Sequence, residues 1–285
     1  MMRVDVPAGP LDYTDTGGDG PVIVLGHGLL MNETHWRKVI PLLDGYRCIT
    51  PTLPLGAHRS PMRADADLTQ SGIARIIADF LDALDLVDVT LVLNDSGGGQ
   101  FVVSEGRADR VGRLVLASCE AFDNFPPRPA RPAAVLCRFP GGTSLFLRLL
   151  STKFVRHNKL AWGGLSKYGI PDEVLDECFA PATRSAEIRR DLRKFSTGTP
   201  RRKTLLTWAS RLSSFDRPVL IVWATEDRMM PPAHAHRLLD LFADARQVLI
   251  DDSWTLIPED QPERFAAALR DFVPARRRAN PSQLS

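Results

Sequence analysis

Residues 91–100 read LVLNDSGGGQ, an apolar run that ends in an acid, a hydroxyl and three consecutive glycines. Apolar runs of this kind favour a buried strand, and the glycines allow a tight turn into a helix. Such a turn places a side chain at a helix amino terminus, where the helix dipole stabilises negative charge. Asp95 and Ser96 are therefore candidate nucleophiles, and a glycine turn without chemistry is the alternative.

Two further acids follow apolar runs later in the chain. Glu120 comes after the run at 113–118, and Asp227 ends the run at 218–227. If these runs are neighbouring parallel strands, their carboxylates meet Asp95 at one edge of the sheet, and like-charge repulsion raises at least one carboxyl pKa. A protonated acid beside a carboxylate can perform general acid–base chemistry. The alternative is that Glu120 and Asp227 only bind loop amides.

The elements that position these acids alternate along the chain. Short apolar runs predict strands, and amphipathic segments at 70–86, 231–242 and 262–273 predict covering helices. This alternation indicates an α/β fold with a mainly parallel sheet and helices on both faces, in which ligands bind at the carboxyl ends of the strands. The predicted strands lie at 21–28, 47–54, 88–95, 113–118, 218–227 and 246–251.

The alternation breaks between residues 126 and 210. A proline-rich stretch opens this region, and helical-looking basic segments without a convincing strand follow it. The sequence therefore predicts a core of residues 1–125 and 211–275, with a helical cap at 126–210. Residues 276–285 are expected to form a flexible tail.

Three features in this order resemble the α/β-hydrolase family. They are a His-Gly pair, His27 and Gly28, after the first core strand, the LNDSGGG turn, and Asp227 before a proline-capped helix. The resemblance covers nearly the whole chain and implies the α/β-hydrolase fold with a helical cap insertion. It is more specific to the fold than to an activity.

The resemblance also implies a register for the turn. Family turns read strand, any residue, nucleophile, any residue, Gly, Gly, which makes Asp95 the nucleophile and gives the backbone N–H of Ser96 to the oxyanion hole, together with that of Leu29. A shift of one residue makes Ser96 the nucleophile, with Asn94 where glycine is usual. The expected pocket residues are His27, Gly28, Leu29, Leu30, Asn94, Gly97 and Trp254.

An aspartate nucleophile is similar to the haloalkane dehalogenase and epoxide hydrolase branch, in which a carboxylate attacks carbon and the resulting ester is hydrolysed. The chain departs from both patterns. Ser96 and Leu29 stand where dehalogenases carry the tryptophan and asparagine that hold the halide. Epoxide hydrolases use cap tyrosines, and the insertion contains only Tyr168, whose expected place is that of a partly buried aromatic in the cap.

The larger departure concerns the base. The family segment of the form D-S-G-H-F aligns with DDSWTL, which puts Trp254 at the glycine and Thr255 at the histidine. Threonine is not a base near pH 7, so the usual route to an activated water is absent. None of the six histidines has a sequence-based claim to replace it. Asp95, Ser96, Glu120, Asp227 and Thr255 are the catalytic candidates.

Composition excludes several classes of protein. The 285 residues are 44% hydrophobic with a net charge of +2, which gives no nucleic-acid footprint. No apolar run reaches the roughly 20 residues of a membrane helix, and the amino terminus lacks a secretion signal, so a cytoplasmic protein is expected. The four cysteines have no CxxC spacing and indicate reduced thiols.

No cofactor or metal is expected, the expected partner is a small-molecule substrate, and the oligomeric state stays open.

Three functions follow. The first is a hydrolase that acts through Asp95 on a small, largely apolar ester, epoxide or related molecule. The second is a non-hydrolytic isomerase, lyase or cyclase in which Asp95 moves protons. The third is a ligand-binding protein that has kept the pocket without turnover.

Overall fold

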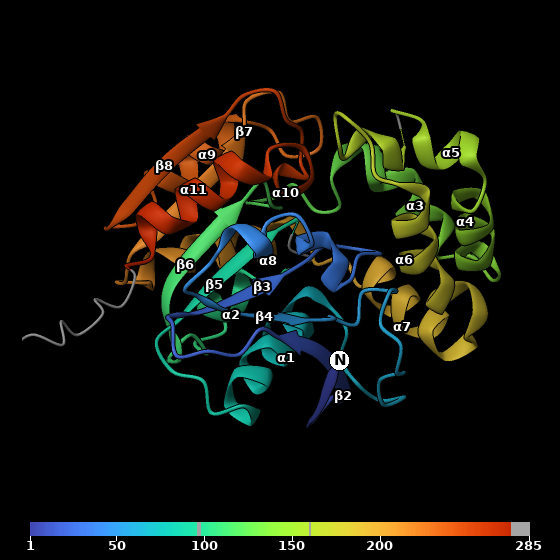
Figure 1. The fold of residues 1–285 in the computed structure, drawn as a ribbon. Coiled ribbons are helices and arrows are strands. Elements are labelled where there is room, and N and C mark those ends of the chain that lie inside the picture. The colour runs from blue at the N-terminus through green and yellow to red at the C-terminus, as the bar shows by residue number, and fades with distance from the viewer. Residues whose placement is uncertain (96–97, 160, 275–285) are drawn as a thin grey trace, which may run out of the picture.

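A computed structural model describes residues 1–95, 98–159 and 161–274 (Figure 1). The sheet in these residues has eight strands in the order β1-β2-β4-β3-β5-β6-β7-β8. The β1–β2 and β2–β4 pairs are antiparallel and the remaining pairs are parallel. The strands are β1 (Met2–Val6), β2 (Gly9–Asp15), β3 (Val22–Gly26), β4 (Arg47–Pro51), β5 (Val89–Asn94), β6 (Val111–Ala117), β7 (Val219–Ala224) and β8 (Ala245–Ile250).

The predicted strands correspond to β3 through β8, whereas β1 and β2 carry no comparable apolar run. Their sequences, MRVDV and GPLDYTD, mix polar and apolar residues, and the two strands form the antiparallel end of the sheet. Antiparallel strands can keep one face in water, so they need no continuous apolar run. The mainly parallel α/β sheet that the sequence predicts is present, with this antiparallel hairpin added.

Strand side chains alternate between two apolar cores. On β7, Val219, Ile221 and Trp223 face one core, and the intervening residues face the other. The first core is covered by α1 (Gln70–Ala83), α2 (Phe101–Ser104), α8 (Arg202–Arg211) and α9 (Ala233–Leu239). The second is covered by α11 (Pro262–Phe272) and the short 3-10 helices η1 (Glu33–Trp36) and η2 (Ile40–Leu42).

The helical insertion lies between β6 and β7, and Figure 1 shows its helices α3 to α7 gathered beside one end of the sheet. They are α3 (Arg131–Leu136), α4 (Gly142–Leu150), α5 (Lys153–His157), α6 (Asp172–Arg184) and α7 (Ala186–Thr197). The apolar faces of α4, α6 and α7 form a separate core that includes Leu30 and Ala57 from loops of the sheet, and Val155 of α5 packs against it. The last helix of the insertion, α8, instead packs on α2, where the rings of Phe101 and Trp208 are 5.0 Å apart.

The division into core and cap at residues 126 and 210 stays a prediction, and the expected tail at 276–285 lies outside the described residues. All four cysteines are free and buried. Among the described residues, no helix combines the length and apolar character that crossing a bilayer requires.

Candidate active site

Asp95 is the first residue after β5, and its backbone is left-handed, with φ of 47°. For a residue other than glycine this conformation costs about 1–3 kcal/mol, so it persists only where the surrounding structure enforces it. Here the Asp95 N–H donates to the carbonyl oxygen of Ser118, after β6, at 3.3 Å. Asp95 is 7% exposed. Two predicted site residues, Ser96 and Gly97, lie outside the described residues.

The Asp95 carboxyl lies against the turn that follows β3. A Cβ atom built on Gly28 would lie 2.0 Å from the Asp95 carbonyl oxygen and 2.2 Å from its Oδ2. No real Cβ contact is that short, so only glycine allows the two turns to approach this closely. Leu30, the second residue after Gly28, has φ of 49° and donates its N–H to the Leu55 carbonyl at 2.9 Å. The turn after β3 therefore lies directly against Asp95.

A cavity of about 370 Å³ opens in front of Asp95. Its described lining is largely apolar, contains the carboxyl groups of Asp95 and Glu120, and includes no histidine, lysine, arginine or tyrosine. Leu29, a predicted oxyanion residue, is part of this lining. The other lining residues are Phe125–Pro127, Pro129, Ala130, Pro132–Ala134, Leu136, Cys137, Phe146, Leu149, Leu150, Val155, Ala161, Trp162, Leu165, Phe195, Ser196 and Met229.

Burial and like charges perturb the carboxyl groups. Burial, followed by repulsion from Glu120 and Asp227, raises the pKa of Asp95 well above its usual range. Burial raises the pKa of Asp227 to about 6, although hydrogen bonds to its charged form oppose the shift. Glu120 and Asp227 thus lie close enough to Asp95 for their charges to raise its pKa, as the predicted cluster of three acids requires.

Asp227 is held by three donors. Its Oδ1 accepts the backbone N–H groups of Met229 and Met230 and the hydroxyl of Thr255, each at 2.8 Å. Its Oδ2 is buried, and a hydrogen bond from the Ser118 side chain to the carboxyl group also lowers the Asp227 pKa. Thr255 is fully buried, and its hydroxyl donates its hydrogen bond to Asp227. Asp227 does bind loop amides, as one of the two sequence-based interpretations predicted. It also accepts a hydrogen bond from the Thr255 hydroxyl.

Asn94 belongs to a buried crosslink below the cavity. Its Nδ2 donates to the carbonyl oxygens of Ala117 at 2.9 Å and Thr255 at 2.8 Å, and its Oδ1 lies 2.8 Å from His35 Nε2. The Asn94 amide thereby joins β5, the end of β6 and the Thr255 loop. This arrangement positions the neighbouring Asp95 and gives Asn94 no place in the cavity lining.

The histidines are engaged elsewhere. His27 Nδ1 is 2.9 Å from the Gly28 carbonyl oxygen, and its Nε2 accepts the N–H of Leu53 at 2.9 Å. Burial lowers the pKa of His27 to about 4 and that of His35 to about 3, so both rings are neutral. All six histidines are among the described residues, and none lines the cavity that holds Asp95.

The sequence is similar to those of known alpha/beta hydrolases. Residues 23–268 match the model of the alpha/beta hydrolase family. The chain belongs to this family. A haloalkane dehalogenase from Mesorhizobium japonicum is 28% identical over 273 residues, which cover 92% of this chain and 78% of that protein. A 2-hydroxy-6-oxononadienedioate/2-hydroxy-6-oxononatrienedioate hydrolase from Escherichia coli is 26% identical over 276 residues, covering 92% and 90%.

Among solved structures, the haloalkane dehalogenase DatA from Agrobacterium tumefaciens C58 superposes with a TM-score of 0.74 at 20% identity, covering 95% of this chain and 96% of that one. An enol-lactonase from Burkholderia xenovorans LB400 gives 0.67 at 18% identity, covering 95% and 99%. The predicted α/β-hydrolase fold is therefore confirmed. Within this alpha/beta hydrolase, the helical insertion between β6 and β7 holds much of the cavity wall.

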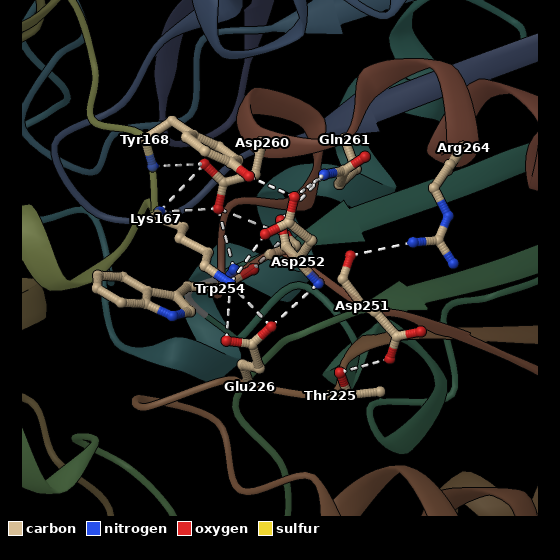
Figure 2. A network of polar contacts seen from close by, with 11 residues as sticks. Lys167, Tyr168, Thr225, Glu226, Asp251, Asp252, Trp254, Asp260, Gln261 and Arg264 are labelled. Atoms are coloured by element: carbon tan, nitrogen blue, oxygen red, sulfur yellow. Dashed lines mark hydrogen bonds and ion pairs between the residues drawn. The ribbon is translucent and has the colours of Figure 1, made fainter.

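Two aromatic residues considered from the sequence lie away from that cavity. Trp254 is buried, yet its ring is covered by the guanidinium group of Arg228 at 4.0 Å and is not part of the cavity lining. Tyr168 is 64% exposed, so its predicted partial burial is wrong. Its hydroxyl bonds to Asp252 in the polar network of Figure 2, where Lys167 and Tyr168 of the insertion meet acids that follow β7 and β8. This network attaches the insertion to the core.

Sequence reasoning missed the wall of the cavity. The proline-rich run indicates the start of the insertion, but it also supplies apolar lining residues, namely Phe125, Pro126, Pro127, Pro129, Ala130, Pro132, Ala133 and Ala134. A signal was present, because the run directly follows the segment that carries Glu120. Phe195, Trp162 and Met229 come from distant segments, and no local pattern relates them to Asp95.

Asp227→Asn is expected to change how stability depends on pH. The Asp227 pKa is about 6 in the folded protein and about 4 in an unfolded chain. Stability associated with this raised pKa is therefore present below about pH 4 and is lost as the pH rises through 6. Relative to the wild type, the variant should gain about 3 kcal/mol of unfolding free energy between pH 4 and pH 8.

Urea unfolding at the two pH values measures this gain. Asparagine keeps an oxygen for the Thr255, Met229 and Met230 donors, so the comparison isolates the charge. The exposed Asp216→Asn is the control, and it should leave the pH dependence unchanged. An equal pH dependence in the wild type and Asp227→Asn contradicts a raised pKa at this residue.

Proposed function

We propose that this alpha/beta hydrolase acts on a small, largely apolar molecule with an electrophilic carbon, such as an ester, an epoxide or a haloalkane, and that Asp95 is its nucleophile. One observation carries the proposal: a carboxyl group on a strained turn is held at the wall of an apolar cavity. Strained backbone of this kind concentrates at active sites. The similarity to a haloalkane dehalogenase and to a 2-hydroxy-6-oxononadienedioate/2-hydroxy-6-oxononatrienedioate hydrolase supports a hydrolytic reaction.

The proposed reaction has two steps. The Asp95 carboxylate attacks the carbon and forms an ester, and water then attacks the ester carbonyl. We further propose that the catalytic triad is atypical, with Thr255 in place of the histidine, because the Thr255 hydroxyl occupies the hydrogen bond to Asp227. Without an imidazole the second step loses a contribution of about 10²–10⁴-fold. The ester should therefore accumulate.

The cap assignment is part of the proposal. Residues 126–210 would form a lid over Asp95, and their contribution of most lining residues supports this. The backbone N–H of Leu29 would bind the developing oxyanion together with that of Ser96, since Leu29 lies in the lining beside Gly28.

A second candidate is a non-hydrolytic isomerase, lyase or cyclase. The raised pKa of Asp95 favours it, because a carboxyl group that keeps its proton more readily can donate and take back that proton without forming a covalent bond. A ligand-binding protein without turnover is the third candidate, and it requires no reactivity of Asp95.

Trapping the ester separates these candidates. The protein is incubated with a small alkyl bromide or a terminal epoxide, and intact-mass and peptide mass spectrometry locate any adduct. We expect one adduct per chain, on the peptide that contains Asp95. Asp95→Asn keeps the shape of the side chain and should form no adduct. Isomerised or cleaved product without an adduct supports the second candidate, and ligand-induced thermal stabilisation without either supports the third.

A further inference from the structure

The cavity in front of Asp95 contains one other described carboxyl group, that of Glu120. The two residues follow neighbouring parallel strands, β5 and β6, whose ends are in register with Asn94 opposite Ala117. The Asp95 N–H bonds to Ser118 at 3.3 Å, and the Gln100 side chain bonds to the Glu120 carbonyl at 2.7 Å. The sheet and the segment after the turn thus hold the backbones of both residues.

We propose that Glu120 is the proton donor and proton acceptor of the Asp95 reaction. The inference rests on the proposed function and assigns to Glu120 a direct chemical role at the substrate. Its support is geometric: Glu120 is 7% exposed and lines the same apolar cavity as Asp95. Two acids confined there do not both ionise readily, and repulsion from Glu120 contributes to the raised pKa of Asp95. Burial and mutual repulsion therefore favour a state in which the pair carries one proton.

In the first step, the Asp95 carboxylate forms a bond to the substrate carbon. When the leaving atom is an oxygen, as in an epoxide, the carbon–oxygen bond breaks, its electron pair moves to that oxygen, and the oxygen takes the Glu120 proton. The products are an Asp95 hydroxyalkyl ester and a Glu120 carboxylate. A bromide leaving group needs no proton, so this step with an alkyl bromide does not require the acid.

In the second step, the Glu120 carboxylate takes a proton from water while the water oxygen attacks the Asp95 ester carbonyl. Collapse of the tetrahedral intermediate breaks the bond between the acyl carbon and the substrate oxygen, which regains the proton from Glu120. The pair again holds one proton, now on Asp95, and an epoxide has become a diol. Transfer of that proton from Asp95 to Glu120 restores the Asp95 carboxylate and the Glu120 acid with which the first step begins. A carboxylate is a weaker base than an imidazole, which keeps this step slow.

The other groups near Asp95 fit these roles less well. Asp227 contributes to the charge felt by Asp95, but its Oδ1 is bound to three donors and it is not part of the cavity lining. Cys137 lines the cavity, and burial raises the pKa of its thiol, so it stays protonated. Thr255 has no acidic or basic group at neutral pH.

The test is Glu120→Gln, which keeps the size of the side chain and removes its proton chemistry. Adduct formation at Asp95 and adduct loss are timed by mass spectrometry with an alkyl bromide and with an epoxide of the same chain length. We expect the bromide to form the ester within a few-fold of the wild-type rate, and the epoxide to react about 10²–10⁴-fold more slowly. The ester should also outlast that of the wild type with either probe.

The two probes separate chemistry from structure, because a misplaced Asp95 slows both reactions equally. Equal slowing, or wild-type rates with both probes, overturns the role of Glu120 while leaving the proposed function intact. Failure of both probes to label Asp95 in the wild type overturns the proposed function and this inference with it. Glu263→Gln, which removes an exposed carboxyl group on α11, is the matched control and should behave as the wild type.

Discussion

Thr255→His is expected to shorten the lifetime of the Asp95 ester by about 10²–10⁴-fold, the usual contribution of a positioned general base. The Thr255 hydroxyl lies 2.8 Å from Asp227 Oδ1, so an imidazole at this position can donate its Nδ1–H to the same carboxylate. Such a bond leaves Nε2 as the basic nitrogen and orients it by the Asp227 charge. Turnover of an epoxide or bromide should rise until ester formation limits the rate.

The measurement is the decay of the trapped adduct by intact mass, together with steady-state turnover. Thr255→Asn is the matched control, because it offers a polar group of similar reach without a base near pH 7, and it should leave the ester long-lived. Thr255 is fully buried, so circular dichroism and thermal unfolding must show that the histidine variant folds. If Thr255→His folds but its adduct decays no faster than the wild-type adduct, the result contradicts the proposal that Thr255 occupies the position of the catalytic histidine.

The central sheet could be predicted because its signal is local. Strands β3, β5, β6, β7 and β8 each contain at least three consecutive apolar residues. Helix α1 carries its apolar residues at helical spacing behind Thr69, whose side chain accepts the Gly72 N–H. The β1–β2 hairpin has no such signal because its strands mix polar and apolar residues. The positions of Asp95 and Asp227 followed from the turns that end these strands.

The surroundings of these acids were harder to predict because they depend on contacts between distant segments. The Thr255 hydroxyl meets Asp227 across 28 positions of the chain, and the Asn94 amide meets the Thr255 carbonyl across 161. The sequence predicted Asn94 as a pocket residue. Only the tertiary structure shows that its side-chain amide is hydrogen-bonded to three buried partners. Trp254 is similar: its alignment position was clear, but the charges that cover its ring come from other loops.

Gly28→Ala is expected to destabilise the fold and to disable Asp95 together. The new Cβ would lie 2.0 Å from the Asp95 carbonyl oxygen and 2.2 Å from its Oδ2, so the two turns must separate. Overpacking of this kind costs about 1–3 kcal/mol, and the obstructing atom here is backbone, which gives way less readily than a side chain. A shift of the nucleophile by about 1 Å reduces reaction rates by about 10²-fold.

Urea unfolding and the rate of Asp95 labelling by an alkyl bromide measure the two effects. Gly26→Ala is the matched control two residues earlier, where the nearest atom to the new Cβ is a Leu93 methyl at 2.8 Å, the movable end of a side chain. This variant should lose less stability and keep its labelling rate within a few-fold. The contrast matters because both glycines are buried beside β5, yet only Gly28 touches the acid. Wild-type labelling in a folded Gly28→Ala would show that the reactive position of Asp95 does not depend on the turn after β3.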